Sequence, residues 1–213
     1  MNHRMLNNKK VPSMVKDQQL IKVRRAQMIK GAVKLFIEKG FHRTTTREIA
    51  KEAGFSIGTL YEYIGSKEDI LYLVCDDIYM EVSKRLKKQL SENGTHLERL
   101  KQAITSYFHI IDDMSDEVLV MYQETKSLQK DALKYVLEKE KEMVEMMQNL
   151  IQQCIQSGEL TMNEQESKLL AHNILVQGQM WTFRRWSIRK LFTLDEYISI
   201  QIKQLLYNHT STI

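Results

Sequence analysis

The sequence contains very few residues that interrupt helices. Its single proline is Pro12, so no proline occurs in the rest of the 213-residue chain. Proline ends or kinks a helix because it lacks a backbone N–H and because its ring fixes φ. Few of the patterns that are typical of strands occur in the chain. The sequence therefore predicts an all-α fold.

Cysteine is also scarce, and long apolar runs are absent. Cys75 and Cys154 are the two cysteines; they show no CxxC spacing, and their number excludes a disulfide framework. No stretch approaches the roughly 20 apolar residues that span a membrane. Residues 1–16 are polar, unlike a signal peptide. We therefore expect a cytoplasmic protein in a reducing compartment, with no membrane partner.

Motifs that carry catalytic chemistry are missing as well. The six histidines are scattered, and no P-loop, nucleophile elbow, HxxxH or CxxC metal set occurs. His109 and Asp112 lie at helical spacing and could ligate one metal, but packing is the simpler explanation. The sequence predicts no enzyme, no metal site and no cofactor.

Charge is divided unevenly along the chain. Residues 1–67 contain 14 Lys and Arg against 5 Asp and Glu, a net charge of +9, whereas residues 68–213 contain 17 against 22, a net charge of −5. A basic N-terminal third joined to an acidic remainder is typical of a nucleic-acid-binding head on a body that does not contact DNA. A solvated basic face without a partner is the alternative.

The stretch from Thr44 to Lys67 contains two short helical patterns that meet at a glycine. Thr45 and Glu48 have the spacing of a capping box, in which each side chain bonds the other residue's backbone N–H. Gly54 supplies a left-handed residue that can end the first helix. Apolar residues mark one face of each helix: Ile49, Ala50 and Ala53 in the first, Leu60 and Ile64 in the second.

The second helix has an outer face that suits contact with a nucleic acid. Ser56 is placed to cap this helix. Two short helices joined by a tight glycine turn form a helix-turn-helix, whose second helix enters the major groove of DNA. A helical hairpin packed as core is the alternative, since motif matches produce false positives. The residues that we expect to point away from the apolar stripe are Ser56, Thr59, Tyr61, Glu62 and Tyr63.

The segment from about Gln27 to Leu71 resembles the DNA-binding domain of the TetR family of bacterial transcription regulators. It covers under a quarter of the chain, and the remainder resembles the family only in length and helical character. Ile64 replaces the usual phenylalanine. Ile57 stands where a polar, basic or proline residue is common, so one phosphate contact is missing or replaced by a contact to a thymine methyl. The matching residues are Ala32, Leu35, Phe36, Gly40, Thr44, Thr45, Ile49, Ala50, Ala53, Gly54, Ser56, Gly58, Thr59, Leu60, Tyr61, Tyr63, Lys67, Glu68 and Leu71.

Residues of both short helices are candidates for contact with double-stranded DNA. The first helix begins with free amides and a positive dipole end that attract phosphate, and the resemblance also places its threonine pair near the DNA backbone. Hydroxyl and phenol groups of the second helix can reach phosphates or base edges, and its glycine allows close approach. The resemblance implies that Lys67 grips the DNA backbone. The candidates are Thr45, Thr46, Arg47, Ser56, Gly58, Thr59, Tyr61, Tyr63 and Lys67.

We expect three parts in the chain. Residues 1–18 form a flexible basic tail; an arm that reaches phosphates or a minor groove is the alternative. Residues 19–66 form a three-helix helix-turn-helix domain at the N-terminal side. Residues 67–213 form a larger C-terminal helical domain for effector binding and dimerisation. The first helix of this domain, from Lys67 to about Leu90, is a rigid rod that links both domains.

The stretch from Gln177 to Trp186 mixes aromatic residues with arginines in one helix, which we expect to run from about Asn163 to Lys190. It has three interpretations. It is a dimer interface, where such residues are enriched, or an aromatic core with solvated arginines, or the wall of a pocket for a phosphorylated or carboxylated ligand. The pattern resembles relatives that sense acyl-coenzyme A. The candidates for the effector pocket are His109, Tyr122, Gln123, His172, Asn173, Gln177, Trp181, Arg184 and Arg185.

The sequence therefore predicts a ligand-responsive transcriptional repressor. A single small helix-turn-helix gives little specificity, so we expect a homodimer whose two recognition helices, roughly 34–36 Å apart, bind a near-palindromic operator. The resemblance implies that the last two helices pair with their copies as a four-helix bundle. A small-molecule effector, with a fatty acyl-coenzyme A among the candidates, releases the DNA. A helical DNA-binding protein without an effector is the alternative.

Overall fold

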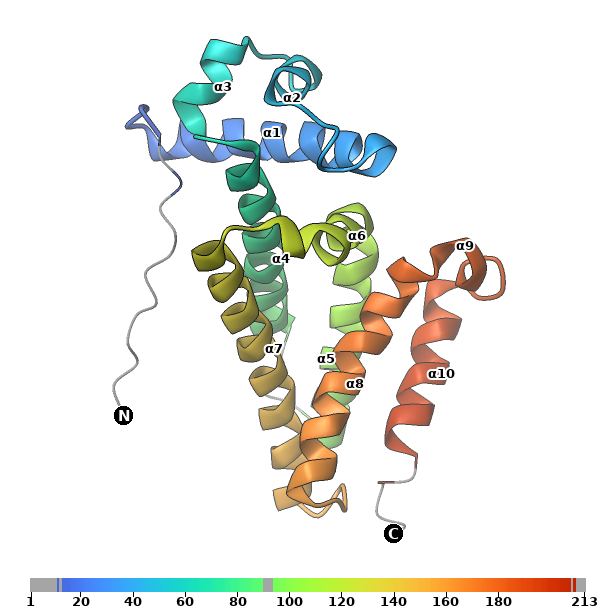
Figure 1. The fold of residues 1–213 in the computed structure, drawn as a ribbon. Coiled ribbons are helices and arrows are strands. Elements are labelled where there is room, and N and C mark those ends of the chain that lie inside the picture. Colours follow the sequence, from blue (N-terminus) through green and yellow to red (C-terminus); the bar gives the residue numbers. More distant parts are fainter. Residues whose placement is uncertain (1–10, 12, 90–93, 208, 210–213) are drawn as a thin grey trace. The chain divides into compact units, whose positions relative to one another are not determined.

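The computed structural model describes residue 11, residues 13–89, residues 94–207 and residue 209. Regular structure in this part of the chain is helical, without a strand, which confirms the all-α prediction for it. None of the helices in these ranges combines the length and the hydropathy that crossing a bilayer demands. The elements, shown in Figure 1, are α1 (Gln18–Lys39), α2 (Thr46–Glu52), α3 (Ile57–Tyr63), α4 (Lys67–Gln89), α5 (His96–Asp113), α6 (Ser115–Glu124), the 3₁₀ helix η1 (Thr125–Ser127), α7 (Lys130–Gln156), α8 (Glu164–Phe183), α9 (Arg185–Ile188) and α10 (Leu194–Leu206).

The contacts of the chain divide it into two compact units. Unit 1 comprises Met1–Ile78 and Asp116–Glu138, and unit 2 comprises Tyr79–Ser115 and Lys139–Ile213. The helices α4 and α7 are each continuous across a boundary between these units. Unit 1 therefore contains the helix-turn-helix together with segments that lie beyond residue 66. The functional boundary at residue 66 stays a prediction.

In unit 1, α1 packs against both α2 and α3 (Figure 1). Met28, Ala32 and Phe36 recur every four residues along α1 and are buried. Gly31 admits α2 closely, because a Cβ atom there would lie 3.3 Å from the backbone nitrogen of Ala53. One small core therefore holds α2 and α3. The apolar faces predicted for these two helices are confirmed by the burial of Ile49, Ala50, Leu60 and Ile64, whereas Ala53 is partly exposed.

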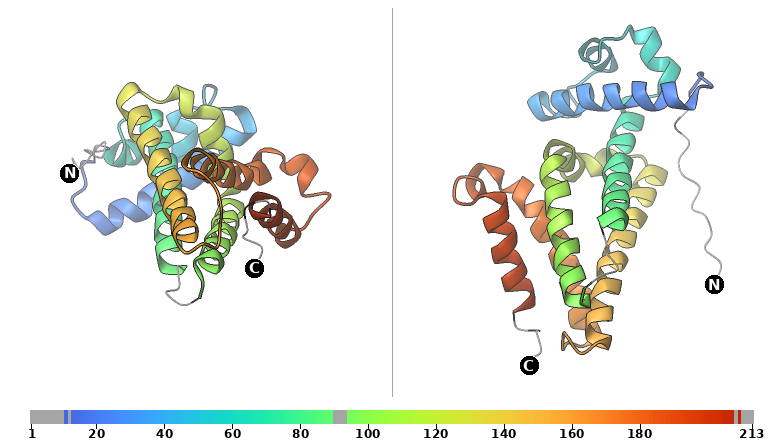
Figure 2. Two further views of the ribbon diagram at one scale, coloured as in Figure 1. Left: turned by 90° about the horizontal axis from the view of Figure 1, so that it is seen from below. Right: turned by 180° about the vertical axis from the view of Figure 1, so that it is seen from behind.

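In unit 2, α5, α8 and α10 pack side by side (Figure 2). The contact is closest at Gly178 of α8, where a Cβ atom would lie 2.5 Å from Cε1 of Tyr107 and 3.1 Å from Cδ1 of Phe108. The rings of Phe108, Trp181 and Tyr197 extend this contact, and the centroids of the last two lie 5.1 Å apart. A larger residue at position 178 would force the rings of α5 away from α8.

A polar cluster joins the ends of α5 and α8 in unit 2. The indole N–H of Trp181 donates to Oδ1 of Asp112 at 2.7 Å, and Arg189 pairs with the same oxygen at 3.0 Å. Arg189 also donates to Oγ of Ser115 at 2.5 Å, and this hydroxyl shares a hydrogen bond of 2.8 Å with buried Thr182. These bonds hold the chain where α8 ends and the short α9 follows. The single helix expected from about residue 163 to 190 is therefore wrong.

Candidate nucleic-acid interface

The start of α2 is held by the predicted capping box. The hydroxyl of Thr45 accepts from the backbone N–H of Glu48 at 3.3 Å, and the Glu48 carboxylate accepts from the N–H of Thr45 at 2.9 Å. Lys39, at the end of α1, forms an ion pair with the same carboxylate. The hydrogen bond with Lys39 and those with Thr45 lower the pKa of Glu48 to about 2. The carboxylate is therefore charged at neutral pH, and the first turn of α2 is fixed.

The turn between α2 and α3 has the conformation that its glycine predicts. Gly54 adopts a φ of 77°, in the left-handed region that glycine enters without a steric penalty. The N–H of Phe55 donates to the carbonyl of Ala50 at 2.8 Å. The hydroxyl of Ser56 then caps α3 by accepting from the N–H of Thr59 at 3.0 Å. The predicted helix-turn-helix is therefore confirmed.

Most of the predicted DNA-contact residues lie together on the outside of α2 and α3. Tyr61 is 45% exposed, and its hydroxyl shares a hydrogen bond of 3.0 Å with Oγ1 of Thr46, so the outer surfaces of the two helices are joined. Arg47, in the first turn of α2, is exposed. We call this surface the reader face. It consists of Thr45, Thr46, Arg47, Ser56, Gly58, Thr59 and Tyr61, which are all exposed or partly exposed.

Tyr63 does not belong to the reader face. Its side chain is only 4% exposed, so the expectation that it points outward is wrong. Tyr63 lies three residues after Leu60, and this spacing places both on one side of a helix. The buried stripe of α3 therefore includes Tyr63 as well as Leu60 and Ile64, and Tyr63 helps to fix α3 on the core of unit 1.

The C-terminal end of α3 is tied to α1 and to the N-terminal segment, which the sequence did not predict. The guanidinium of Arg25 donates to the carbonyl of Tyr63, through Nε at 3.1 Å and Nη2 at 3.0 Å, and to that of Val11 at 2.8 Å. The carbonyl of Glu62 accepts from the N–H of Met14 at 2.8 Å. The last carbonyls of a helix lack partners within it, and these groups supply them.

Several residues of the expected flexible tail, residues 1–18, form hydrogen bonds in the part that the structure describes. Ser13 and Met14 both bond the carbonyl of Glu62. Asp17 caps α1, its carboxylate accepting from the N–H groups of Gln19 and Leu20. The flexibility of the tail stays a prediction, and residues 1–10 and 12 lie outside the described residues.

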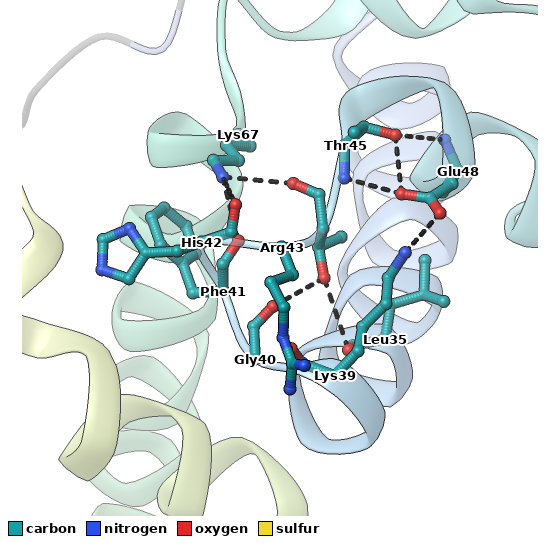
Figure 3. A network of polar contacts seen from close by, with 10 residues as sticks. Leu35, Lys39, Gly40, Phe41, His42, Arg43, Thr45, Glu48 and Lys67 are labelled. Atoms are coloured by element: carbon teal, nitrogen blue, oxygen red, sulfur yellow. Dashed lines mark hydrogen bonds and ion pairs between the residues drawn. The ribbon is translucent and has the colours of Figure 1, made fainter.

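Lys67, the first residue of α4, directs its ammonium group at the loop between α1 and α2 (Figure 3). Its Nζ donates to the carbonyls of Phe41 at 2.9 Å, His42 at 3.3 Å and Thr44 at 3.1 Å. The same atom lies 4.5 Å from the centroid of the Phe41 ring, within the range of a cation–π contact. Each N–H of the ammonium thus has an acceptor in the chain. Contact of Lys67 with a DNA phosphate stays a prediction.

The predicted effector-pocket residues are divided between the two units. Tyr122 and Gln123 lie in unit 1, and the others lie in unit 2. Trp181 is buried. The side-chain oxygen of Gln177 is buried without a hydrogen-bond partner among the described residues. Their assignment to one pocket stays a prediction. Arg185 is partly exposed, and the exposed members are His109, Tyr122, Gln123, His172, Asn173 and Arg184.

A hollow of about 470 Å³ lies in unit 2 beside the end of α7 and the start of α8. None of the predicted effector residues lines it, and no pattern in the sequence marks its position. Across the described ranges, no group of three or more His, Cys, Asp or Glu side chains is arranged to hold a metal ion. The hollow is lined by Gln148, Gln152, Ile155, Met162 and Glu164.

The all-α fold and the reader face define a helix-turn-helix regulator. Comparison with family models agrees with this class. Residues 28–72 match the model of bacterial regulatory proteins of the tetR family, and residues 93–184 match a tetracyclin repressor-like C-terminal domain. The chain belongs to the TetR family of bacterial transcriptional regulators, as the resemblance of the N-terminal segment implied.

Known relatives support this assignment. The HTH-type transcriptional regulator HbdR of Aromatoleum sp. (strain CIB) is 33% identical over 195 residues, which cover 91% of this chain and 84% of HbdR. The fatty acid metabolism regulator protein of Bacillus subtilis (strain 168) is 28% identical over 134 residues, covering 63% of this chain and 69% of that protein. Both relatives are regulators by name, and HbdR is an HTH-type transcriptional regulator.

Solved structures share the fold. The crystal structure of AibR in complex with isovaleryl coenzyme A and operator DNA has a TM-score of 0.73 to this chain. The comparison covers 86% of this chain and 98% of AibR at 17% sequence identity. At this identity the likeness concerns the fold alone. It agrees with an N-terminal helix-turn-helix followed by a larger helical domain.

Proposed function

We propose that the protein is a ligand-responsive repressor that binds a near-palindromic operator as a homodimer and leaves it when a small molecule binds. The observation that carries this proposal is the reader face. It presents hydroxyl, phenol and guanidinium groups on two short, capped helices, within a stretch of 67 residues whose net charge is +9. Such groups donate to phosphates and base edges, and the capped helices hold them at a fixed angle.

In the proposed complex, α2 binds the DNA backbone and α3 enters the major groove. Arg47 pairs with a phosphate, because a guanidinium forms strong charge-assisted bonds with phosphate oxygens. Ser56 and Thr59 meet phosphates or base edges with their hydroxyl groups. The hydrogen bond of 3.0 Å between Thr46 and Tyr61 holds the phenol in one orientation, which limits the groups on DNA that it can meet.

Homodimer formation is supported by exposed apolar side chains on α8 and α10 of unit 2. Leu169 and Val176, seven residues apart on α8, are 61% and 54% exposed, and Ile200 on α10 is 41% exposed. His172 and Asn173 lie between the two α8 residues at helical spacing, so we propose that they belong to this surface, which revises their predicted place in the effector pocket. Pairing α8 and α10 with their copies would remove these apolar side chains from water.

A fatty acyl-coenzyme A is the effector that we propose. The segment around α9 carries Arg184, Arg185 and the exposed indole of Trp186, with the guanidinium of Arg184 lying 5.3 Å from a ring centroid of that indole. Arginine binds phosphate, an aromatic ring can stack on a nucleobase, and coenzyme A contains both groups. The names of two relatives agree with this chemistry: one regulates fatty acid metabolism, and AibR binds isovaleryl coenzyme A.

Release of DNA follows from a difference in affinity. An effector that binds better to a conformation with mis-spaced recognition helices shifts the population toward that conformation. The coupling is reciprocal, so operator DNA must weaken effector binding by the same factor. We assign the transmission to α4, which is continuous from Lys67 to Gln89.

Selection from a random duplex library tests DNA binding. We expect the enriched sequences to be inverted repeats with half-sites about one helical turn apart, and we expect affinity to fall steeply as salt rises. Arg47→Met should weaken binding. It should also make the slope of log affinity against log salt less negative, by about 0.9 for each helix-turn-helix. Enrichment of no sequence, or affinity that ignores salt, would contradict the proposal.

Titration of the operator complex with thioesters tests the effector. Isovaleryl-coenzyme A and palmitoyl-coenzyme A are the probes, and free coenzyme A is the control for the nucleotide portion. We expect a thioester to release the DNA, and we expect Arg185→Met to raise the concentration that release requires. If no thioester releases DNA from an otherwise tight complex, the regulator works without such an effector, and that part of the proposal is wrong.

A further inference from the structure

The loop from Gly40 to Thr44, between α1 and α2, directs three backbone carbonyls at a single place. The oxygens of Phe41, His42 and Thr44 all lie within 3.3 Å of Nζ of Lys67 (Figure 3). Each oxygen carries partial negative charge, so oxygens that share one partner are best matched by a compact cation. An ammonium group offers three N–H donors from one atom and has no acceptor.

The loop lies directly before the cap of α2. Thr44 is 1% exposed; its hydroxyl donates to the carbonyl of Gly40 at 2.9 Å and its N–H donates to that of Phe41 at 3.2 Å. The Phe41 ring, which is 2% exposed, lies next to the Lys67 ammonium. Because Thr45 follows at once and caps α2, the position of the loop sets the position of the first turn of α2.

The start of α4, which carries Lys67, is itself held by hydrogen bonds. In the turn before α4, the carboxylate of Asp69 accepts from the N–H of Gly65 at 3.1 Å, and the hydroxyl of Ser66 accepts from the N–H of Asp69 at 3.2 Å. Asp69 is only 5% exposed. The start of α4 is therefore well defined, and one side chain joins it to the start of α2.

We propose that Lys67 is a positioning residue for operator recognition, which acts through the loop before α2. Its ammonium group gathers the three loop carbonyls, and the loop in turn sets the direction in which α2 meets DNA. The inference rests on the proposed operator binding and adds a positioning role to the phosphate contact that family resemblance implies for this lysine.

Amide hydrogen exchange of the full-length protein without DNA is the first test. Loss of a phosphate contact leaves the free protein unchanged, whereas loss of the carbonyl contacts loosens the loop. We expect Lys67→Met and Lys67→Arg to raise the exchange rates of the Thr44 and Glu48 amides by at least about tenfold. Lys51→Met, which removes an exposed lysine of α2, is the matched control. Unchanged rates in the Lys67 variants would overturn the inference.

Operator affinity is the second test, and arginine is the informative replacement. Arginine binds phosphate well, but its planar guanidinium does not present three donors from one atom. We expect Lys67→Arg to weaken operator binding nearly as much as Lys67→Met, by at least about tenfold, while Lys51→Met binds nearly as tightly as wild type. Tight binding by Lys67→Arg together with weak binding by Lys67→Met would identify a phosphate contact instead.

A double-mutant cycle separates positioning from a general loss of stability. If Lys67 acts through the cap of α2, Lys67→Met and Glu48→Ala, which removes the cap's carboxylate without changing the reader face, disturb one shared arrangement. The double variant should then bind operator only slightly more weakly than either single variant. Losses that multiply would mean independent roles and would overturn the inference. Failure of the wild-type protein to bind any operator would contradict the proposed function, whereas the exchange experiment does not depend on DNA.

Discussion

Gly58 occupies a position in α3 where folding does not require glycine. Outside its immediate neighbours, the nearest described atom to a Cβ there would be Oγ of Ser56 at 3.7 Å. Gly58 is not one of the described glycines that adopt a positive φ. Glycine within a helix costs about 0.5–1 kcal/mol relative to alanine. The proposed close approach of α3 to a DNA groove accounts for a glycine that the fold itself does not need.

We predict that Gly58→Ala keeps or raises the free energy of unfolding, by up to about 1 kcal/mol, but weakens operator binding by at least about tenfold. The added methyl group would separate α3 from the duplex. Calorimetry and operator titration measure the two effects. Gly178→Ala is the control for a glycine that packing does require. Its Cβ would lie 2.5 Å from the Tyr107 ring, so the variant should lose about 1–3 kcal/mol of stability. Wild-type operator affinity in Gly58→Ala would contradict this role.

Side-chain direction on α3 could be predicted from the sequence at most positions. The spacing of Leu60 and Ile64 indicates the buried side correctly. Tyr63 stands at the edge of this stripe, and a tyrosine has both an apolar ring and a polar hydroxyl, so its type does not decide its direction. The partners of Arg25 and Lys67 could not be predicted, because both bind backbone carbonyls distant in sequence, and a carbonyl carries no signal of residue type.

At the scale of the helix, α2 depends on its cap. A helix of seven residues is far too short to be stable alone. The ionised carboxylate of Glu48 accepts from Thr45 and pairs with Lys39, and these partners lower its pKa from 4.5 to about 2. A pKa that is lower in the folded protein contributes stability above the unfolded value, and this contribution is lost as pH falls through the folded value.

We predict that the stability advantage of the wild type over Glu48→Gln is constant above pH 4.5 and shrinks as pH falls toward about 2. Thermal unfolding of both proteins across this range measures the advantage, and an NMR titration of the Glu48 carboxyl measures its pKa. Glu62→Gln, which removes an exposed carboxylate from α3, is the control for the loss of one acidic charge. A stability difference that stays the same down to pH 2 would exclude the ionised cap.

Helix ends with local signals could be predicted, and those fixed by distant contacts could not. The capping-box spacing at Thr95 begins α5, and the last helix, expected from Leu194, runs from Leu194 to Leu206. The end of α8 carries no proline or glycine, so the helical pattern of the sequence continues past it. What holds the chain there is Arg189, which bonds the end of α5 and the start of α6. Such contacts leave no local pattern.

At the scale of the whole molecule, we predict that Val176→Glu converts a wild-type dimer into a monomer, since a carboxylate in an apolar interface would lose its hydration. Operator affinity should fall by about 10²–10⁴-fold, because the two recognition helices would no longer bind together. Sedimentation equilibrium measures the oligomeric state. Leu137→Glu, at a residue of unit 1 that is 58% exposed, is the control and should remain a dimer. A dimeric Val176→Glu protein would place the interface elsewhere.

Composition indicated which third of the chain contains the helix-turn-helix, but it did not indicate how the chain divides into two units. The basic N-terminal third contains the whole reader face. The return of Asp116–Glu138 to unit 1 depends on contacts such as the bond from the Tyr135 hydroxyl to Asp76 at 2.6 Å. These residues are far apart in sequence, and neither shows an unusual local pattern.

The two cysteines are distributed one to each unit: Cys75 lies in unit 1, Cys154 lies in unit 2, and both are buried. Burial raises the pKa of the Cys75 thiol to about 12 and that of the Cys154 thiol to about 11. Only the thiolate attacks an electrophile. A maleimide therefore labels each sulfur only after the part of the fold that buries it has opened. Mass spectrometry of the labelled peptides would therefore time the opening of each unit separately, with no engineered probe.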